Sequence, residues 1–150
     1  MTHKGHYDQR RRARRRALQA IYQWQMTGQD PAEILRQFLE IKDMSGVDVE
    51  HFERILRGVG EHAGQLDEAI GPFLDRPSEQ LDQMERAVLR LGAFELIHCP
   101  EIPFRVVIDE CVDLSARFGS EQGHAFVNAV LDRAAAQWRI HEADDTDRDA

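Results

Sequence analysis

Apolar residues recur at intervals of three and four along most of the chain, which is the period of one face of an α-helix. The first such stretch runs from about Asp8 and ends at Gly28. Its apolar positions are Ala13, Ala17, Ala20, Ile21 and Trp24. No pair of segments shows the two-residue alternation of half-buried strands, so the pattern predicts an all-α fold.

Three further helices are indicated in the next part of the chain. Asp30 and Pro31 supply a capping residue and a first-turn proline for the second helix. Asp48 is suited to cap a third helix, and a fourth follows over 66–74 after a join that is rich in glycine. The apolar positions of these segments again follow the helical period.

The most apolar of the predicted helices comes next, and two more follow it. One helix is expected over 78–97, and a turn with Pro100 and Pro103 follows it. A sixth helix is expected over 107–118, and Ser120 opens the last one. About seven helices with short links predict one compact all-α bundle.

Composition limits the class of protein. The chain has 150 residues, 42% of them apolar and 31% charged, which suits one globular domain with a core. No stretch approaches the roughly 20 apolar residues of a membrane span. Cys99 and Cys111 are too few for a disulfide scaffold, and no secretory signal is recognisable. We therefore expect a soluble cytoplasmic protein.

Charge is distributed unevenly along the chain. Residues 1–16 contain Lys4 and six arginines against Asp8, a net charge of +6, whereas 141–150 carry −4. The total is −8, so the segment between them carries −10. We expect a basic flexible arm over 1–8, a helical domain over 9–140 and an acidic disordered tail over 141–150.

Catalytic and metal-binding patterns are not supported by the sequence. The glycines of the third helical segment follow no strand, so they do not form a dinucleotide loop. His3 and His6 lack further ligands nearby, and Cys111 falls on an apolar helix face. We predict a non-enzymatic protein without cofactor or metal; a metal- or acid-dependent hydrolase stays a weaker alternative.

One side of the first helix carries a pattern that suits an anionic ligand. At about 100° per residue, Arg11, Arg15 and Tyr22 lie close to one line opposite the apolar face. Guanidinium groups bind phosphate oxygens in pairs, and a phenol ring can stack on an unpaired base. The alternative is that Tyr22 is half-buried against a neighbouring helix and that the arginines pair with acidic side chains.

The segments 10–24, 48–52, 85–90, 102–104 and 125–132 resemble, in this order, those of the NusB transcription antitermination factors. The resemblance implies an all-α fold of two small helical lobes and a non-enzymatic role. Members of that family bind the boxA element of nascent ribosomal-RNA transcripts together with NusE, which is also a small-subunit ribosomal protein. The pair then joins NusA, NusG and RNA polymerase.

The resemblance also implies which residues contact each partner. Single-stranded RNA would be bound by Arg10, Arg11, Arg14, Tyr22, Gln122, His124 and Phe126, to which the geometry of the first helix adds Arg15. NusE would contact Glu85. Gln122 and Ala125 depart from the acid and the lysine expected at those positions. The alternative is a helical interaction scaffold or homodimer whose arginine-rich helix binds an acidic partner.

Overall fold

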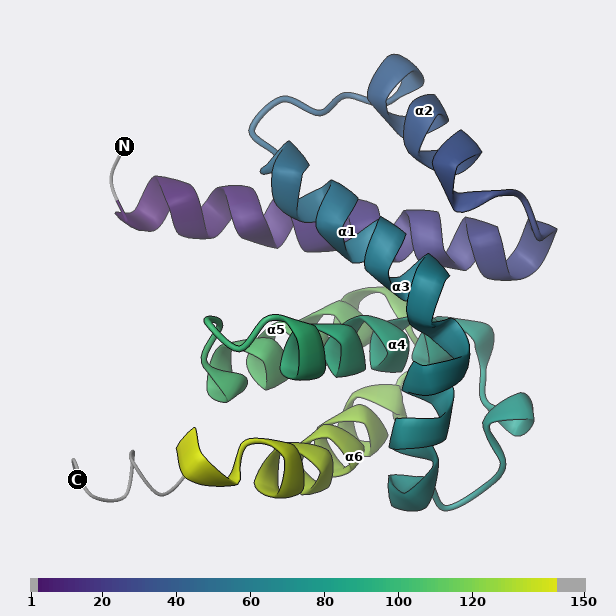
Figure 1. Ribbon diagram of the computed structural model, residues 1–150, viewed down its shortest axis with the longest axis vertical. Coiled ribbons are helices and arrows are strands. Elements are labelled where there is room, and N and C mark those ends of the chain that lie inside the picture. Colours follow the sequence, from purple (N-terminus) through teal and green to yellow (C-terminus); the bar gives the residue numbers. More distant parts are fainter. Residues whose placement is uncertain (1–2, 143–150) are drawn as a thin grey trace. The chain divides into compact units, whose positions relative to one another are not determined.

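The computed structural model describes residues 3–142, with the side chains of residues 3 and 4 excepted, and shows only helices and their connections over this range (Figure 1). The α-helices are α1 (His3–Thr27), α2 (Pro31–Ile41), α3 (Val49–Ile70), α4 (Gln83–His98), α5 (Phe104–Phe118) and α6 (Gly123–Trp138). Two short 3₁₀ turns, η1 (Gly71–Phe73) and η2 (Ser78–Gln80), lie between α3 and α4. The prediction of an all-α fold is confirmed.

The chain divides into two compact units between Ala63 and Gly64, in agreement with the two helical lobes that were expected. The boundaries at the ends of the chain differ from the prediction. Residues 3–8 are not an arm but the beginning of α1, and His141 and Glu142 are helical. The rest of the expected arm and of the expected acidic tail lies outside the described residues. None of the described helices has the length and apolar character of a membrane span.

The first unit is built from α1, α2 and the first part of α3. The Asp30 carboxylate accepts a hydrogen bond from the backbone N–H of Ala32 at 3.0 Å, so α2 begins where the sequence predicts. The rings of Phe38 in α2 and Phe52 in α3 lie 5.7 Å apart. Their burial, together with that of the alanine face of α1, forms the core of this unit.

The third and fourth predicted helices are one element. α3 continues through the glycine-rich join, and only His62 has non-helical backbone angles, with φ −114° and ψ 15°. Glycine costs a helix roughly 1 kcal/mol per residue but does not end it. A Cβ at Gly60 would lie 2.7 Å from Pro31 Cγ, so this glycine lets the start of α2 pack closely.

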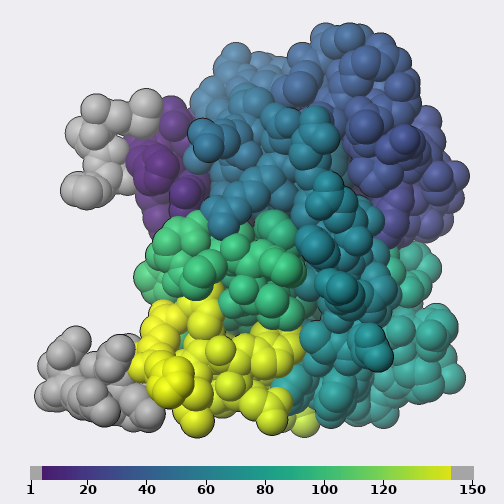
Figure 2. Space-filling model, viewed as in Figure 1, coloured from purple at the N-terminus to yellow at the C-terminus, as the bar shows by residue number. Residues whose placement is uncertain are grey.

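The second unit consists of α4, α5 and α6, which pack on one another, together with the end of α3. The atoms of α5 and α6 lie side by side at the surface in the space-filling view (Figure 2). α4 is buried almost continuously from Ala87 to Leu96, as expected for the most apolar segment. It begins later than predicted, because Asp82 rather than Ser78 caps it, accepting from the N–H of Met84 at 2.7 Å.

Candidate nucleic-acid interface

Three arginines of α1 hold the loop that precedes α3. Arg10 Nε lies 3.5 Å from an oxygen of Asp48. Arg12 donates to the carbonyl oxygen of Gly46 at 3.4 Å, and Arg16 donates to that of Asp43 at 3.1 Å. These guanidinium groups therefore have a structural role within the first unit.

The backbone of the loop that precedes α3 leaves room for these guanidinium groups. Gly46 has a φ of +72°, a conformation that favours glycine, and a Cβ there would collide with the Arg12 guanidinium. The Asp43 carboxylate accepts from the backbone N–H of Ser45 at 2.9 Å. This hydrogen bond, helped by the charge of Arg16, holds the pKa of Asp43 below its ordinary value.

Arg11, Arg15 and Tyr22 lie along a different line of α1 and are partly exposed. The Arg11 guanidinium carbon is 5.9 Å from the centroid of the Tyr7 ring, one turn earlier in the helix. Among the described residues, the side chains of Arg15 and Tyr22 make no hydrogen bond, ion pair or ring contact. We call Arg11, Arg15 and Tyr22 the α1 stripe.

Arg14 differs from the expectation. This predicted RNA contact is buried with 1% of its surface exposed, and Leu18 is buried to the same extent. The buried arc of α1 therefore extends about 160° around the helix, from Ala20 to Leu18. The α1 stripe borders this arc instead of lying opposite to it, and Arg14 is not open to a phosphate chain in this structure.

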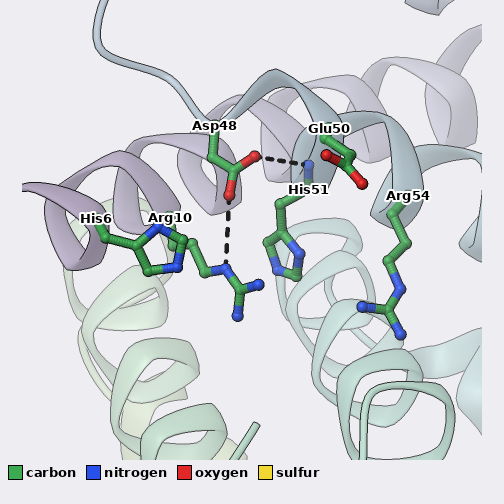
Figure 3. A pocket seen from close by; sticks show the side chains of 6 residues that line it. All are labelled: His6, Arg10, Asp48, Glu50, His51 and Arg54. Atoms are coloured by element: carbon green, nitrogen blue, oxygen red, sulfur yellow. Dashed lines mark hydrogen bonds and ion pairs between the residues drawn. The ribbon is translucent and has the colours of Figure 1, made fainter. Parts of the chain in front are cut away.

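A cleft of about 170 Å³ lies beside Arg10 where α1 meets the start of α3 (Figure 3). Asp48 is at its centre: the carboxylate pairs with Arg10 and also accepts from the backbone N–H of His51 at 3.0 Å. The lining residues are His6, Arg10, Asp48, Glu50, His51 and Arg54. Sequence reasoning missed this cluster because its members come from α1, α3 and the loop that precedes α3. Among the described residues, no group of side chains is arranged to hold a metal ion.

The other predicted contacts lie in the second unit, at the start of α6. Gln122 and His124 are exposed, and Phe126 is half-buried. Glu85, the predicted NusE contact, is 8% exposed and accepts from the Ser120 hydroxyl at 3.3 Å. Ser120 thus binds Glu85 instead of opening α6, which begins at Gly123. The predicted residues therefore form two clusters, one in each unit.

Comparison with known proteins decides what kind of molecule carries these clusters. The model of the NusB family matches residues 11–136. The chain belongs to the NusB family. A transcription antitermination protein NusB of Nitrosococcus oceani is 49% identical over 135 residues, which cover 90% of each chain.

Solved structures of the NusB family share the fold. NusB of T. maritima superimposes with a TM-score of 0.74 at 32% identity, over 83% of this chain and 89% of that one. A NusB chain crystallised with NusE and dsRNA gives a TM-score of 0.76 at 29% identity, over 83% of this chain and 93% of that one. The prediction that this chain is not an enzyme is confirmed by its family.

Proposed function

We propose that this chain is an RNA-binding antitermination factor that binds boxA-type single-stranded RNA of nascent ribosomal-RNA transcripts together with NusE. The α1 stripe is the observation that carries the proposal. Arg15 and Tyr22 have no partner among the described residues, while their neighbours Arg12 and Arg16 are bound to a loop. A relative of known structure is named as a complex of NusB and NusE with dsRNA, which supports RNA as the class of ligand and NusE as the partner. The choice of a single strand rests on the α1 stripe.

The chemistry of the stripe suits a single strand. Arginine forks bind phosphate oxygens through two parallel N–H groups, and this binding does not depend on base sequence. The Tyr22 ring offers a face on which an unstacked base can lie, and such stacking contributes about 1–3 kcal/mol per base. A duplex hides its base faces, so a stacking aromatic residue favours single-stranded RNA.

The acidic remainder of the chain suits a basic protein partner. Residues 17–140 carry a net charge of −10, which repels RNA and favours encounter with a basic ribosomal protein such as NusE. RNA affinity of the isolated chain is therefore modest and rises when NusE is bound. The pair would then act in the cytoplasm with NusA, NusG and RNA polymerase.

A binding titration tests this proposal. A labelled boxA-like single strand, a scrambled strand and a duplex of the same sequence are titrated with the chain, with and without NusE. We expect the boxA-like strand to bind more tightly than either competitor and more tightly again when NusE is present. Equal binding of duplex and single strand would contradict the single-strand proposal. A dimer that buries α1 and binds no RNA would favour the scaffold alternative.

A further inference from the structure

Arg76 in the second unit lies over the ring of Phe126. Its guanidinium carbon is 5.0 Å from the ring centroid, within the range of a cation–π contact. Arg76 belongs to the short connection between η1 and η2, whereas Phe126 is in the first turn of α6. Nothing in the spacing of the sequence connects these two residues, which are fifty positions apart.

The connection that carries Arg76 is fastened to α6. Arg133 donates to the carbonyl oxygen of Phe73 at 2.7 Å. The Phe73 ring packs edge-on against Trp138, with 5.8 Å between the ring centroids. Because Arg133 and Trp138 both belong to α6, the η1 turn is fixed to the helix that carries Phe126. The position of Arg76 is therefore set by the fold of this unit.

The Arg76 guanidinium can exchange its carboxylate partner for another anion. That partner is the adjacent Asp75, which accepts from Arg76 Nε at 2.8 Å and from an Arg76 Nη at 3.3 Å, and both side chains are exposed. Exposed ion pairs contribute little to stability, so a competing anion can replace Asp75. A phosphate offers the fork-shaped guanidinium two oxygens in a suitable geometry.

We propose that Arg76 is a further RNA-binding residue, held in place by Phe126 and binding a backbone phosphate of single-stranded RNA in place of Asp75. The inference rests on the proposed function. It also changes the role expected for Phe126, which becomes a positioning residue whose outer ring face is occupied by a guanidinium. The exposed side chains of Gln122 and His124 lie on the same end of α6 and extend this contact surface.

A double-mutant cycle tests the inference in the full chain. Arg76→Ala, Phe126→Leu and the double variant are compared in titrations of boxA-like single-stranded RNA over a range of salt concentrations. Arg76→Ala is expected to weaken binding about fivefold and to flatten the salt slope by about 0.7. Phe126→Leu is expected to weaken binding in the same direction, and the double variant to bind about as Arg76→Ala does.

Arg105→Ala is the matched control. Arg105 is also exposed, lies 5.3 Å from the ring centroid of Phe104 and is 3.5 Å from Asp132. We expect this change to leave both affinity and salt slope close to those of the parent chain. Circular dichroism of each variant establishes that the fold is retained.

Two results would overturn the inference while leaving the proposed function in place. One is unchanged RNA binding by Arg76→Ala when replacement of the α1 stripe abolishes it. The other is full additivity of the two single changes, which would mean that Phe126 contacts RNA independently of Arg76. If the parent chain binds no RNA, the proposed function and the inference both fail.

Discussion

Arg12, Arg15 and Arg16 lie within five positions of α1, and their surroundings differ. Arg12 and Arg16 donate to loop carbonyl groups, whereas Arg15 has no partner among the described residues. A carbonyl bound by a guanidinium stabilises the fold, and an unpartnered guanidinium repels its neighbours until an anion arrives. We therefore propose that different arginines of this run serve folding and ligand binding.

Single substitutions separate these two roles. Arg15→Ala should weaken binding of single-stranded RNA about five- to tenfold and change the free energy of unfolding by less than about 0.5 kcal/mol. Arg16→Ala should do the reverse, with a loss of about 1 kcal/mol of stability and a small effect on RNA binding. Urea unfolding and RNA titration measure the two quantities. Equal effects of both changes on RNA binding would contradict the assignment of separate roles to Arg15 and Arg16.

The sequence predicted the residues of the α1 stripe but not the burial and the contacts of the residues beside it. The positions of Arg11, Arg15 and Tyr22 follow from helix geometry alone. The burial of Arg14 and Leu18 does not, because the alanines of α1 lie on one side of a wider buried arc. The partners of Arg12 and Arg16 could not be predicted from the sequence either, because the path of a loop over a helix depends on tertiary packing.

Among the helices, the end of α4 is stabilised by one buried side chain. Arg139 follows α6 and donates to four backbone carbonyl oxygens, and it pairs with Glu142. The four are those of Glu95, Leu96, Cys99 and Ile102. The carbonyl oxygens of Glu95 and Cys99 also accept from backbone N–H groups, so the guanidinium adds to these hydrogen bonds. It also supplies a donor to Leu96 in the last turn of α4, and it thereby ties the end of α4 to the segment that follows α6.

Removal of this side chain should be costly. Arg139→Met removes a charged donor from four carbonyl groups and takes away the partner of Glu142, and it is expected to lower the free energy of unfolding by about 3–5 kcal/mol. Arg139→Lys should recover only part of this, because an ammonium group lacks the planar fork. Urea unfolding followed by circular dichroism measures both variants. Wild-type stability in either variant would contradict this role.

The contact between the end of α3 and α4 predicts a pH dependence. Arg90 donates to Asp67 at 2.7 Å and Arg86 at 3.2 Å. Burial raises the pKa of Asp67, but these hydrogen bonds and charges outweigh it and hold the pKa below its ordinary value. The ion pairs therefore stabilise the fold above about pH 4, and this stabilisation is lost as the pH falls through the lower native pKa.

Asp67→Asn isolates this contribution. At neutral pH the variant should be less stable than the parent chain by about 2 kcal/mol, because three charge-assisted hydrogen bonds from Arg86 and Arg90 are weakened. The difference should shrink toward zero as the pH falls below about 4. Urea unfolding at a series of pH values measures it. A difference in the free energy of unfolding that does not change with pH would show that the charge of Asp67 does not stabilise the fold.

Helix boundaries were predictable where a local signal dominates. Asp30 and Pro31 mark the start of α2 correctly because capping needs only adjacent residues. The start of α4 was misplaced because Ser78 and Asp82 are both suitable caps, and only packing selects between them. The continuity of α3 was missed for the same reason, since Gly60 packs against Pro31, a residue distant in sequence.

For the whole molecule, uneven charge is the property that matters most for function. A chain of net charge −8 that binds RNA must do so through a localised basic surface and must keep its acidic remainder away from the strand. On the proposed function, this arrangement predicts RNA binding that is weak, dependent on salt and responsive to a basic protein partner. The uneven distribution of charge could be read from the sequence, whereas the two clusters of predicted contact residues became visible only in the folded units.

The salt dependence of RNA binding tests the central claim most directly. With about four phosphates neutralised, the logarithm of the association constant should fall with the logarithm of salt concentration at a slope near −3. The variant Arg11→Ala, Arg15→Ala, Tyr22→Ala should bind much more weakly and with a slope flattened by about 1.4. Arg36→Ala, which removes an exposed arginine of α2 paired with Glu33 and Glu40, should behave as the parent chain does. Unchanged affinity and slope in the triple variant would contradict the account.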